Sequence, residues 1–140
     1  MGSLLITNGR LVTLDEDDRF IDSGSVYIEG NRIVDVGDFT ADTYSPDRTL
    51  DARGSLEMPG LINAHHHLYS TFARGFTPPG PQAQNFEENL KNLWWKLDSA
   101  LSAEDVYFSA LLAVMHAARA GCTTIIDHHA SPACWDGSLD

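Results

Sequence analysis

Short runs of β-type residues with alternating hydrophobic and polar positions occupy the first 36 residues of the chain. Successive side chains of a strand point to opposite faces, so this alternation is typical of a sheet with one buried face. Turn-forming residues separate the runs at Asn8-Gly9, at residues 15–18 and at Gly30-Asn31, which predicts hairpins there. The pattern therefore predicts a β-sandwich arm with strands at residues 4–8, 10–14, 25–29 and 32–36.

A loop and a change of pattern follow this arm. Residues 40–47 are small, polar and proline-containing, which indicates a loop, and residues 49–52 then have the character of a returning strand. The dipeptide Pro59-Gly60 interrupts the chain after one more short apolar stretch. We therefore expect an amino-terminal β-sandwich domain over residues 1–58 and a second domain over residues 59–140.

The second part of the chain alternates strand-like and helix-like patterns. Apolar residues at 61–62 lead into a histidine cluster and have the character of a buried strand, and residues 122–127 form a second apolar, β-branched run. Between them, the prolines of residues 75–81 exclude a helix and predict a loop, whereas residues 85–97 carry apolar side chains at helical spacing. This order of elements is typical of a βαβ unit in an α/β fold.

Another helix is predicted from residue 103 to about residue 120. Ser102 followed by acidic residues is typical of a capped helix start, and Gly121 is typical of a helix end. The face that packs inward is expected to carry the apolar residues of this segment, which are Phe108, Leu111, Leu112, Met115 and Ala118.

Composition and charge exclude several classes of partner. The formal net charge is −11, with only nine lysines and arginines, which argues against binding to nucleic acid or to an anionic membrane. A hydrophobic content of 43% and a charged content of 21% are typical of a globular protein. No apolar run approaches the roughly 18 residues of a membrane-spanning helix, so we expect a cytoplasmic location. Two cysteines are too few to indicate a disulfide framework.

Histidines follow both predicted strands of the second part. His65 and His67 are two residues apart, so in a strand they point to the same side while His66 points away. Zinc binds neutral imidazole nitrogen at about 2.0–2.1 Å, and a catalytic zinc site uses roughly three protein ligands with one position open. The pair can therefore supply two ligands, although three adjacent histidines are equally compatible with a surface patch.

The cluster Asp127-His128-His129 follows the second predicted strand. Parallel strands in α/β folds bring functional residues to one carboxyl edge, so these histidines are candidates to hydrogen-bond a metal ligand or to contact substrate, as is His66. Two other interpretations are an exposed loop with chance histidines and a small zinc knuckle made by His128, His129 and Cys134. The knuckle lacks the paired spacing that structural zinc sites usually show.

The stretch MPGLINAHHHLYS resembles the first barrel strand of the amidohydrolase superfamily, whose signature is Pro-Gly-apolar-apolar-Asn/Asp-x-His-x-His. The segments ITNGRLVTLD, VYIEGNRIVDVG and LDARGSLEMPG resemble the amino-terminal arm of its cytosine deaminase and triazine chlorohydrolase branch. Residues 85–132 are most similar to aminohydrolases of the SsnA type, which are associated with selenium metabolism. The resemblance implies an α/β fold in which the arm precedes the first β-α-β part of a (β/α)8 TIM-like barrel. A whole barrel takes about 250 residues, so we expect it to be incomplete here.

The resemblance also implies a chemistry. It makes His65 and His67 ligands of a divalent metal, zinc before iron, which activates hydroxide for attack on an amidine-type or heterocyclic small-molecule substrate. The expected function is hydrolysis of carbon–nitrogen bonds other than peptide bonds, as in a deaminase. The family's other ligands and its acid/base groups come from later strands. We therefore expect no catalytic residue within these 140 residues, and the chain alone should be inactive.

Other functions and an assembly state remain open at this point. A chlorohydrolase or alkylaminohydrolase of triazine-like rings would use the same metal, and a non-catalytic amidohydrolase-like scaffold would need no histidine pair. Parallel sheets are normally covered on both faces, so a partial barrel would expose apolar surface. We therefore expect self-association into a homo-oligomer.

Overall fold

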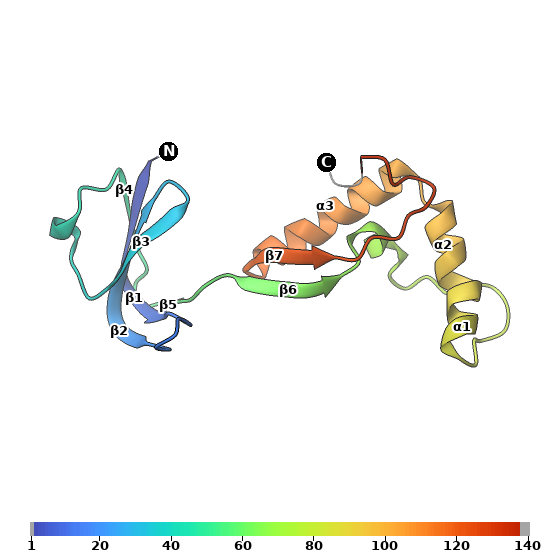
Figure 1. Ribbon diagram of the computed structural model, residues 1–140, viewed down its shortest axis with the longest axis horizontal. Helices are drawn as coiled ribbons and strands as arrows, with labels where there is room; N and C mark the ends of the chain where they lie inside the picture. The colour runs from blue at the N-terminus through green and yellow to red at the C-terminus, as the bar shows by residue number, and fades with distance from the viewer. Residues whose placement is uncertain (1, 138–140) are drawn as a thin grey trace. The chain divides into compact units, whose positions relative to one another are not determined.

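The computed structural model describes residues 2–137 and has a mixed α/β architecture (Figure 1). The chain divides between Pro59 and Gly60 into two compact units. No helix of the described residues is long and apolar enough to cross a bilayer.

The first unit is a five-stranded sheet with the order β3-β2-β1-β4, in which β5 also pairs with β1. Antiparallel pairing joins β1 to β2 and β2 to β3, whereas β4 and β5 run parallel to β1. Leu5, Leu11 and Tyr27 form its buried core, and the ring of Tyr27 stacks on that of Tyr44 at 4.0 Å. The strand bounds are β1 Ser3–Val12, β2 Phe20–Glu29, β3 Arg32–Gly37, β4 Arg48–Asp51 and β5 Leu56–Glu57, with a 3-10 turn η1 at Ala41–Thr43.

The predicted hairpin at Asn8-Gly9 is wrong, because β1 continues through it. Asn8 has a φ of 58°, and the β1–β2 register shifts on both sides of Gly9, so the dipeptide forms an irregularity within one strand. A Cβ at Gly9 would overlap the carboxylate end of the Glu57 side chain, which would then have to move. The other two predicted turns are confirmed, since β1–β2 and β2–β3 are antiparallel neighbours, and β4 matches the predicted returning strand.

The second unit contains two parallel strands, β6 Leu61–His66 and β7 Cys122–Asp127, joined by helical segments. The strand β7 has the bounds expected from the sequence. The connection comprises the 3-10 segment η2 Leu68–Ala73, the helix α1 Phe86–Asn89, the π-helical turn η3 Leu90–Trp94, and the helices α2 Trp95–Ala100 and α3 Ala103–Arg119. The segments α1, η3 and α2 are consecutive, so the predicted helix over residues 85–97 is present but contains an unexpected π-helical turn.

Both ends of α3 confirm the sequence prediction. The Ser102 side chain accepts a hydrogen bond from the Asp105 backbone N–H at 3.2 Å, and the Asp105 carboxylate accepts one from the Ser102 backbone N–H at 2.9 Å. This reciprocal capping box satisfies two backbone donors that a helix start leaves unpaired. At the other end, Gly121 has a φ of 79°, a conformation that glycine adopts without a steric cost.

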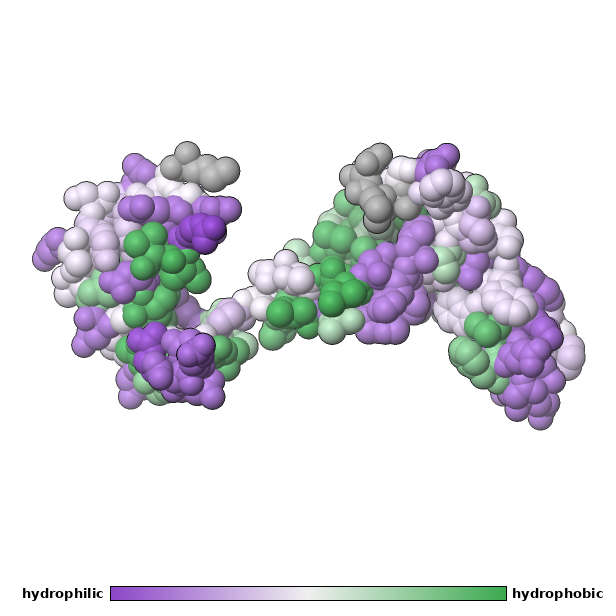
Figure 2. Space-filling view, in the orientation of Figure 1, coloured by the Kyte–Doolittle hydropathy of each residue, from purple (hydrophilic) through white to green (hydrophobic). Residues whose placement is uncertain are grey.

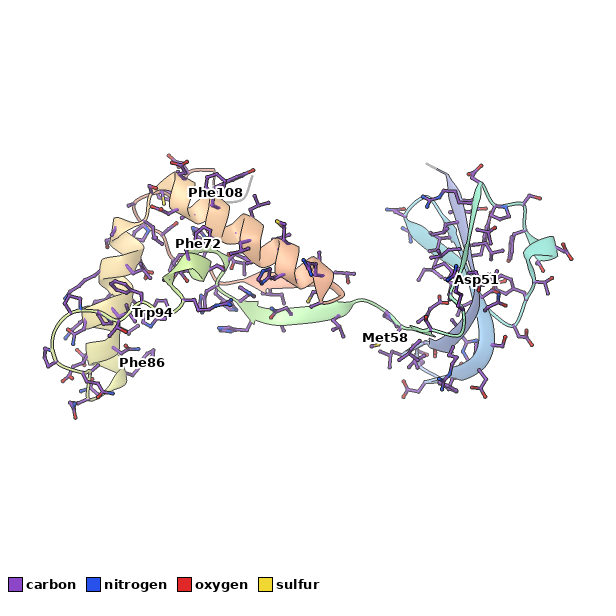
Figure 3. All side chains as sticks on the ribbon, turned by 180° about the vertical axis from the view of Figure 1, so that it is seen from behind. Asp51, Met58, Phe72, Phe86, Trp94 and Phe108 are labelled. Atoms are coloured by element: carbon purple, nitrogen blue, oxygen red, sulfur yellow. The ribbon has the colours of Figure 1, made fainter. Side chains whose placement is uncertain are left out.

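The predicted inward face of α3 is wrong. Its buried residues are Val106, Ser109 and Ala113, whereas Phe108 and Met115 are 45% and 54% exposed. The small side chains of Ser109 and Ala113 allow η2 to pack closely, and the Phe72 backbone N–H reaches the Ser109 hydroxyl at 3.4 Å (Figure 3). The larger apolar residues of α3, such as Phe108 and Met115, lie on its exposed face. Figure 2 shows further apolar residues gathered on this unit where β6 and β7 lie. Of the other three predicted residues, Leu111 and Ala118 are exposed and Leu112 is half-buried.

Candidate metal centre

The histidine cluster lies where β6 ends. The β6–β7 register pairs Asn63 with Ile125 and His66 with Asp127, so β6 contains one extra residue between these pairs. Such a bulge redirects side chains at the end of a strand. His65 lies inside this irregular stretch, and His67 follows the strand and precedes η2.

The structure brings the side chains of His65 and His67 together. Their Nε2 atoms are 3.2 Å apart, and their ring planes are inclined at 80°. Two nitrogens bound to one tetrahedral zinc at 2.0–2.1 Å would be separated by about 3.3 Å. The same distance also fits a hydrogen bond between the rings, so the pair can be bridged by a proton or by a metal ion.

A backbone carbonyl selects the tautomer of His67. Nδ1 of His67 lies 2.7 Å from the carbonyl oxygen of His128. A carbonyl only accepts hydrogen bonds, so Nδ1 carries the proton and Nε2 presents its lone pair toward His65. This is the form of imidazole that binds a metal through Nε2, and metal-binding histidines commonly donate their other N–H in this way.

His65 is held from its own strand and from the residue that follows β7. Its backbone N–H donates to the side-chain oxygen of Asn63 at 3.2 Å. Its ring stacks on that of His128, with centroids 4.3 Å apart and planes inclined at 27°. His128 therefore supports the pair twice, through its carbonyl to His67 and through its ring to His65.

The other two candidate histidines do not join this pair. The backbone carbonyl of His66 accepts from the His128 N–H at 2.8 Å, while Nδ1 of its ring is buried without a hydrogen-bond partner among the described residues. The Nδ1 atom of His129 lies 3.7 Å from the Asp127 carboxylate, and its Nε2 contacts the hydroxyl of Ser131.

The zinc knuckle considered for residues 128–134 is not formed. The thiol of Cys134 donates to the carbonyl of Leu101 at 3.4 Å rather than facing the histidines. Across residues 2–137, no group of three or more His, Cys, Asp or Glu side chains is arranged to hold a metal ion. The described residues therefore offer His65 and His67 and no third ligand.

A buried polar pair, which the sequence pattern did not predict, lies beside the histidines. The Tyr69 hydroxyl donates to Asp98 at 2.9 Å, and both side chains are buried. Burial, reinforced by the bond to Asp98, raises the pKa of Tyr69 to about 12, and burial also raises the pKa of Asp98. Nothing in the helical pattern of residues 85–97 distinguishes Asp98 from a solvent-facing acid.

The proline-containing loop forms a separate hollow. Together with α1 and η3 it borders an open hollow of about 680 Å³, lined by residues 77–86 and by Asn89, Asn92 and Leu93. Neither His65 nor His67 lines this hollow.

Comparison with known proteins identifies relatives that act on nucleosides. The chain is 36% identical over 127 residues to a 5'-deoxyadenosine deaminase of Methanosarcina mazei, a match that covers 91% of this chain and 28% of the relative. It is 34% identical over 125 residues to a 5-methylthioadenosine/S-adenosylhomocysteine deaminase of Thermoanaerobacter pseudethanolicus, covering 89% and 28% of the two chains. The chain thus spans about 28% of the length of the curated relatives it matches.

Solved structures of zinc-containing enzymes also resemble this chain. An adenosine deaminase from Xanthomonas campestris with bound zinc superposes with a TM-score of 0.75 at 29% identity, covering 89% of this chain and 28% of that one. An atrazine chlorohydrolase from Arthrobacter aurescens complexed with zinc has a TM-score of 0.70 at 30% identity, covering 90% and 28%. The model of the amidohydrolase family matches residues 57–134, which include both strands and both histidine clusters. More than half of the sequence fits this model, and the chain therefore belongs to the amidohydrolase family.

Proposed function

We propose that this chain provides the first two metal ligands, His65 and His67, of a zinc-dependent hydrolase that removes an amino group from a nitrogen heterocycle. The observation that carries the proposal is the 3.2 Å approach of the two Nε2 atoms, with the His67 proton held on Nδ1. His67 then presents its Nε2 lone pair toward His65, and two neutral imidazole nitrogens at this separation are the kind of donor set that zinc accepts. Iron is the alternative metal.

Each unit has a separate part in this proposal. The five-stranded sheet over residues 1–59 would be the β-sandwich arm, and β6, the helices and β7 would begin a (β/α)8 barrel. Active sites of such barrels lie at the carboxyl ends of the strands, where His65, His67 and His128 are found. A bound divalent metal would supply an acidified water as the nucleophile. The chain's own residues fix the two ligand rings and the tautomer of His67.

The substrate class is inferred from relatives. Deaminases of adenosine derivatives are among the most similar curated proteins, and a zinc-bound adenosine deaminase is among the similar structures. We therefore propose a purine nucleoside or a related amidine-type ring as substrate, and ammonia as the product. Loss of halide from a triazine-like ring is the second candidate, because a zinc-bound atrazine chlorohydrolase has a similar fold.

The 140 residues alone should not catalyse the reaction. A catalytic zinc site uses about three protein ligands, and the described residues provide only two. Further ligands would have to come from other parts of the complete barrel or from a second copy of the chain.

Metal analysis of the protein expressed from its complete natural reading frame tests this proposal. We expect about one zinc or iron per chain, lost in His65→Ala/His67→Ala and retained in the control His116→Ala, which replaces an exposed histidine of α3. Release of ammonia from adenosine derivatives, compared with release of chloride from a chlorotriazine, separates the two reactions. Metal binding that survives loss of both histidines would refute the assignment.

A further inference from the structure

We propose that Asp127 is a positioning residue that holds the backbone following His67, so that Nε2 of His67 points at Nε2 of His65. This inference rests on the proposed metal-binding function of the histidine pair. Asp127 is the last residue of β7 and is opposite His66 in the parallel register.

The contact that carries the inference is a hydrogen bond between the start of η2 and the end of β7. The backbone N–H of Leu68 donates to Oδ1 of Asp127 at 2.8 Å, and the two residues are 59 positions apart in sequence. Leu68 is the first residue of η2, after β6 has ended, so its N–H is one of the donors that a helical start leaves unpaired. A carboxylate acceptor makes this a charge-assisted bond, which is stronger than one between neutral groups.

Three successive residues around His67 are held by two residues of β7 and its extension. The His66 carbonyl accepts from the His128 N–H at 2.8 Å, Nδ1 of His67 donates to the His128 carbonyl at 2.7 Å, and Leu68 donates to Asp127. The first two bonds use the backbone of His128 and survive any substitution of its side chain other than proline. The third depends on the side chain of Asp127, so a single substitution can remove it.

A histidine also lies near the other oxygen of the Asp127 carboxylate. Its Oδ2 atom lies 3.7 Å from Nδ1 of His129, whose Nε2 contacts the hydroxyl of Ser131. Although this order of Ser, His and Asp matches a nucleophilic triad, Ser131 is 2% exposed and no substrate can reach it. The His129 ring instead lies beside the Asp127 oxygen that Leu68 does not use.

Release of Leu68 would free the ring of His67. If the backbone at residue 68 moves, the hydrogen bond from Nδ1 of His67 to the His128 carbonyl is no longer aligned. The ring proton of His67 can then move from Nδ1 to Nε2. A protonated Nε2 cannot bind metal. Removal of a group that orients a metal ligand typically weakens metal binding by about 10- to 100-fold, and we expect a loss in this range for Asp127→Ala.

The experiment compares Asp127→Ala with Asp127→Asn, which keeps a side-chain oxygen to accept from Leu68. Two readouts are used, both on the protein expressed from its complete natural reading frame. The first is the dissociation constant for Zn²⁺ in competition with a chelator. The second is the tautomer of His67 in metal-stripped protein, measured by ¹⁵N NMR of histidine-labelled samples. Asp136→Ala serves as the control, because it removes a different, exposed aspartate from the segment that follows β7.

We expect the wild type and Asp127→Asn to keep the His67 proton on Nδ1. Asp127→Ala should show a mixture of tautomers and about 10- to 100-fold weaker Zn²⁺ binding. Wild-type tautomer and affinity in Asp127→Ala would overturn the inference. Equal losses of Zn²⁺ affinity in Asp127→Asn and Asp127→Ala would overturn it as well. Asparagine keeps a side-chain oxygen that can accept from Leu68, so equal losses would show that this hydrogen bond does not position His67.

Leu68→Pro tests the same bond from the donor side if Asp127→Ala fails to fold. Proline lacks the N–H and is tolerated at the first position of a helical segment, and His67, with a φ of −127° and a ψ of 85°, lies outside the α region that a following proline disfavours. Leu68→Pro should reproduce the tautomer mixture, and an unchanged His67 tautomer would refute the inference. Because the NMR readout needs no metal, it stands even if the wild type binds none, in which case only the proposed function fails.

Discussion

The hydroxyl of Tyr69 donates a 2.9 Å hydrogen bond to Oδ1 of Asp98, and the two residues tie η2 to α2. Tyr69 is 3% exposed and Asp98 is 8% exposed, so little water can replace either partner. Because the pKa of Tyr69 is raised to about 12, the phenol stays protonated and remains the donor at every physiological pH. The bond thereby anchors the segment that directly follows His67.

Tyr69→Phe should lower the free energy of unfolding by about 1–3 kcal/mol, because it leaves a buried carboxyl group without its donor. Chemical denaturation of the purified protein measures this loss. Tyr107→Phe is the matched control, since Tyr107 is 61% exposed and its substitution should change stability by less than about 0.5 kcal/mol. Equal effects of the two substitutions would show that the bond to Asp98 adds nothing.

The capping box of α3 predicts a dependence of stability on pH. The side chain and the backbone N–H of Ser102 donate to Asp105 and hold the pKa of that carboxyl below its ordinary 3.8. A pKa that is lower in the folded state than in the unfolded state stabilises the fold above the unfolded value, and this contribution is lost as the pH falls below 3.8.

Ser102→Ala should therefore lower stability by about 1 kcal/mol at neutral pH and should flatten the decline below pH 3.8. Unfolding measured across this range checks both effects. Glu104→Gln is the control, because it removes a carboxylate from the same first turn of α3 while leaving the Ser102–Asp105 pair intact, and it should keep the steep decline. A Ser102→Ala curve parallel to that of the wild type would contradict the prediction.

Gly60→Ala should destabilise the second unit by about 1–3 kcal/mol. Gly60 precedes β6, and a Cβ at this position would overlap the side chain of Thr123 on β7, so the two segments approach more closely than any larger residue allows. Thr123→Gly should restore part of the loss in the double variant. Gly37→Ala is the control, because the nearest atom to its added Cβ is 3.8 Å away. Equal unfolding free energies for Gly60→Ala and the wild type would refute the close approach.

Local chemistry made some of the fold predictable. The cap at Ser102, the glycine at 121 and the β-branched run of β7 each specify a conformation through neighbours in sequence, and the structure has all three. The spacing of His65 and His67 also predicted that they converge, and they do, although a bulge precedes His66 and His67 lies just after the end of β6.

Contacts distant in sequence explain what could not be predicted. The Asn8-Gly9 dipeptide has the composition of a turn, but β4 and β5 pair along the same strand and keep it continuous. The inward face of α3 is chosen by the close approach of η2, which favours Ser109 over the larger apolar residues. The hydrogen bond from His67 to the backbone carbonyl of His128 could not be predicted either, because every residue has a backbone carbonyl and the sequence does not show which one lies near His67.

His128→Ala should leave the metal affinity within about tenfold of the wild type, whereas His67→Ala should abolish binding. The reason is that His67 is oriented by the backbone carbonyl of His128, which alanine retains, while only the stacking of the His128 ring on His65 is lost. Titration of the metal-stripped variants with Zn²⁺ measures the difference, and His116→Ala again controls for loss of an exposed imidazole. If His128→Ala lost the metal as completely as His67→Ala, the His128 ring would itself be a ligand, and its stacked position beside His65 would have to change when metal binds.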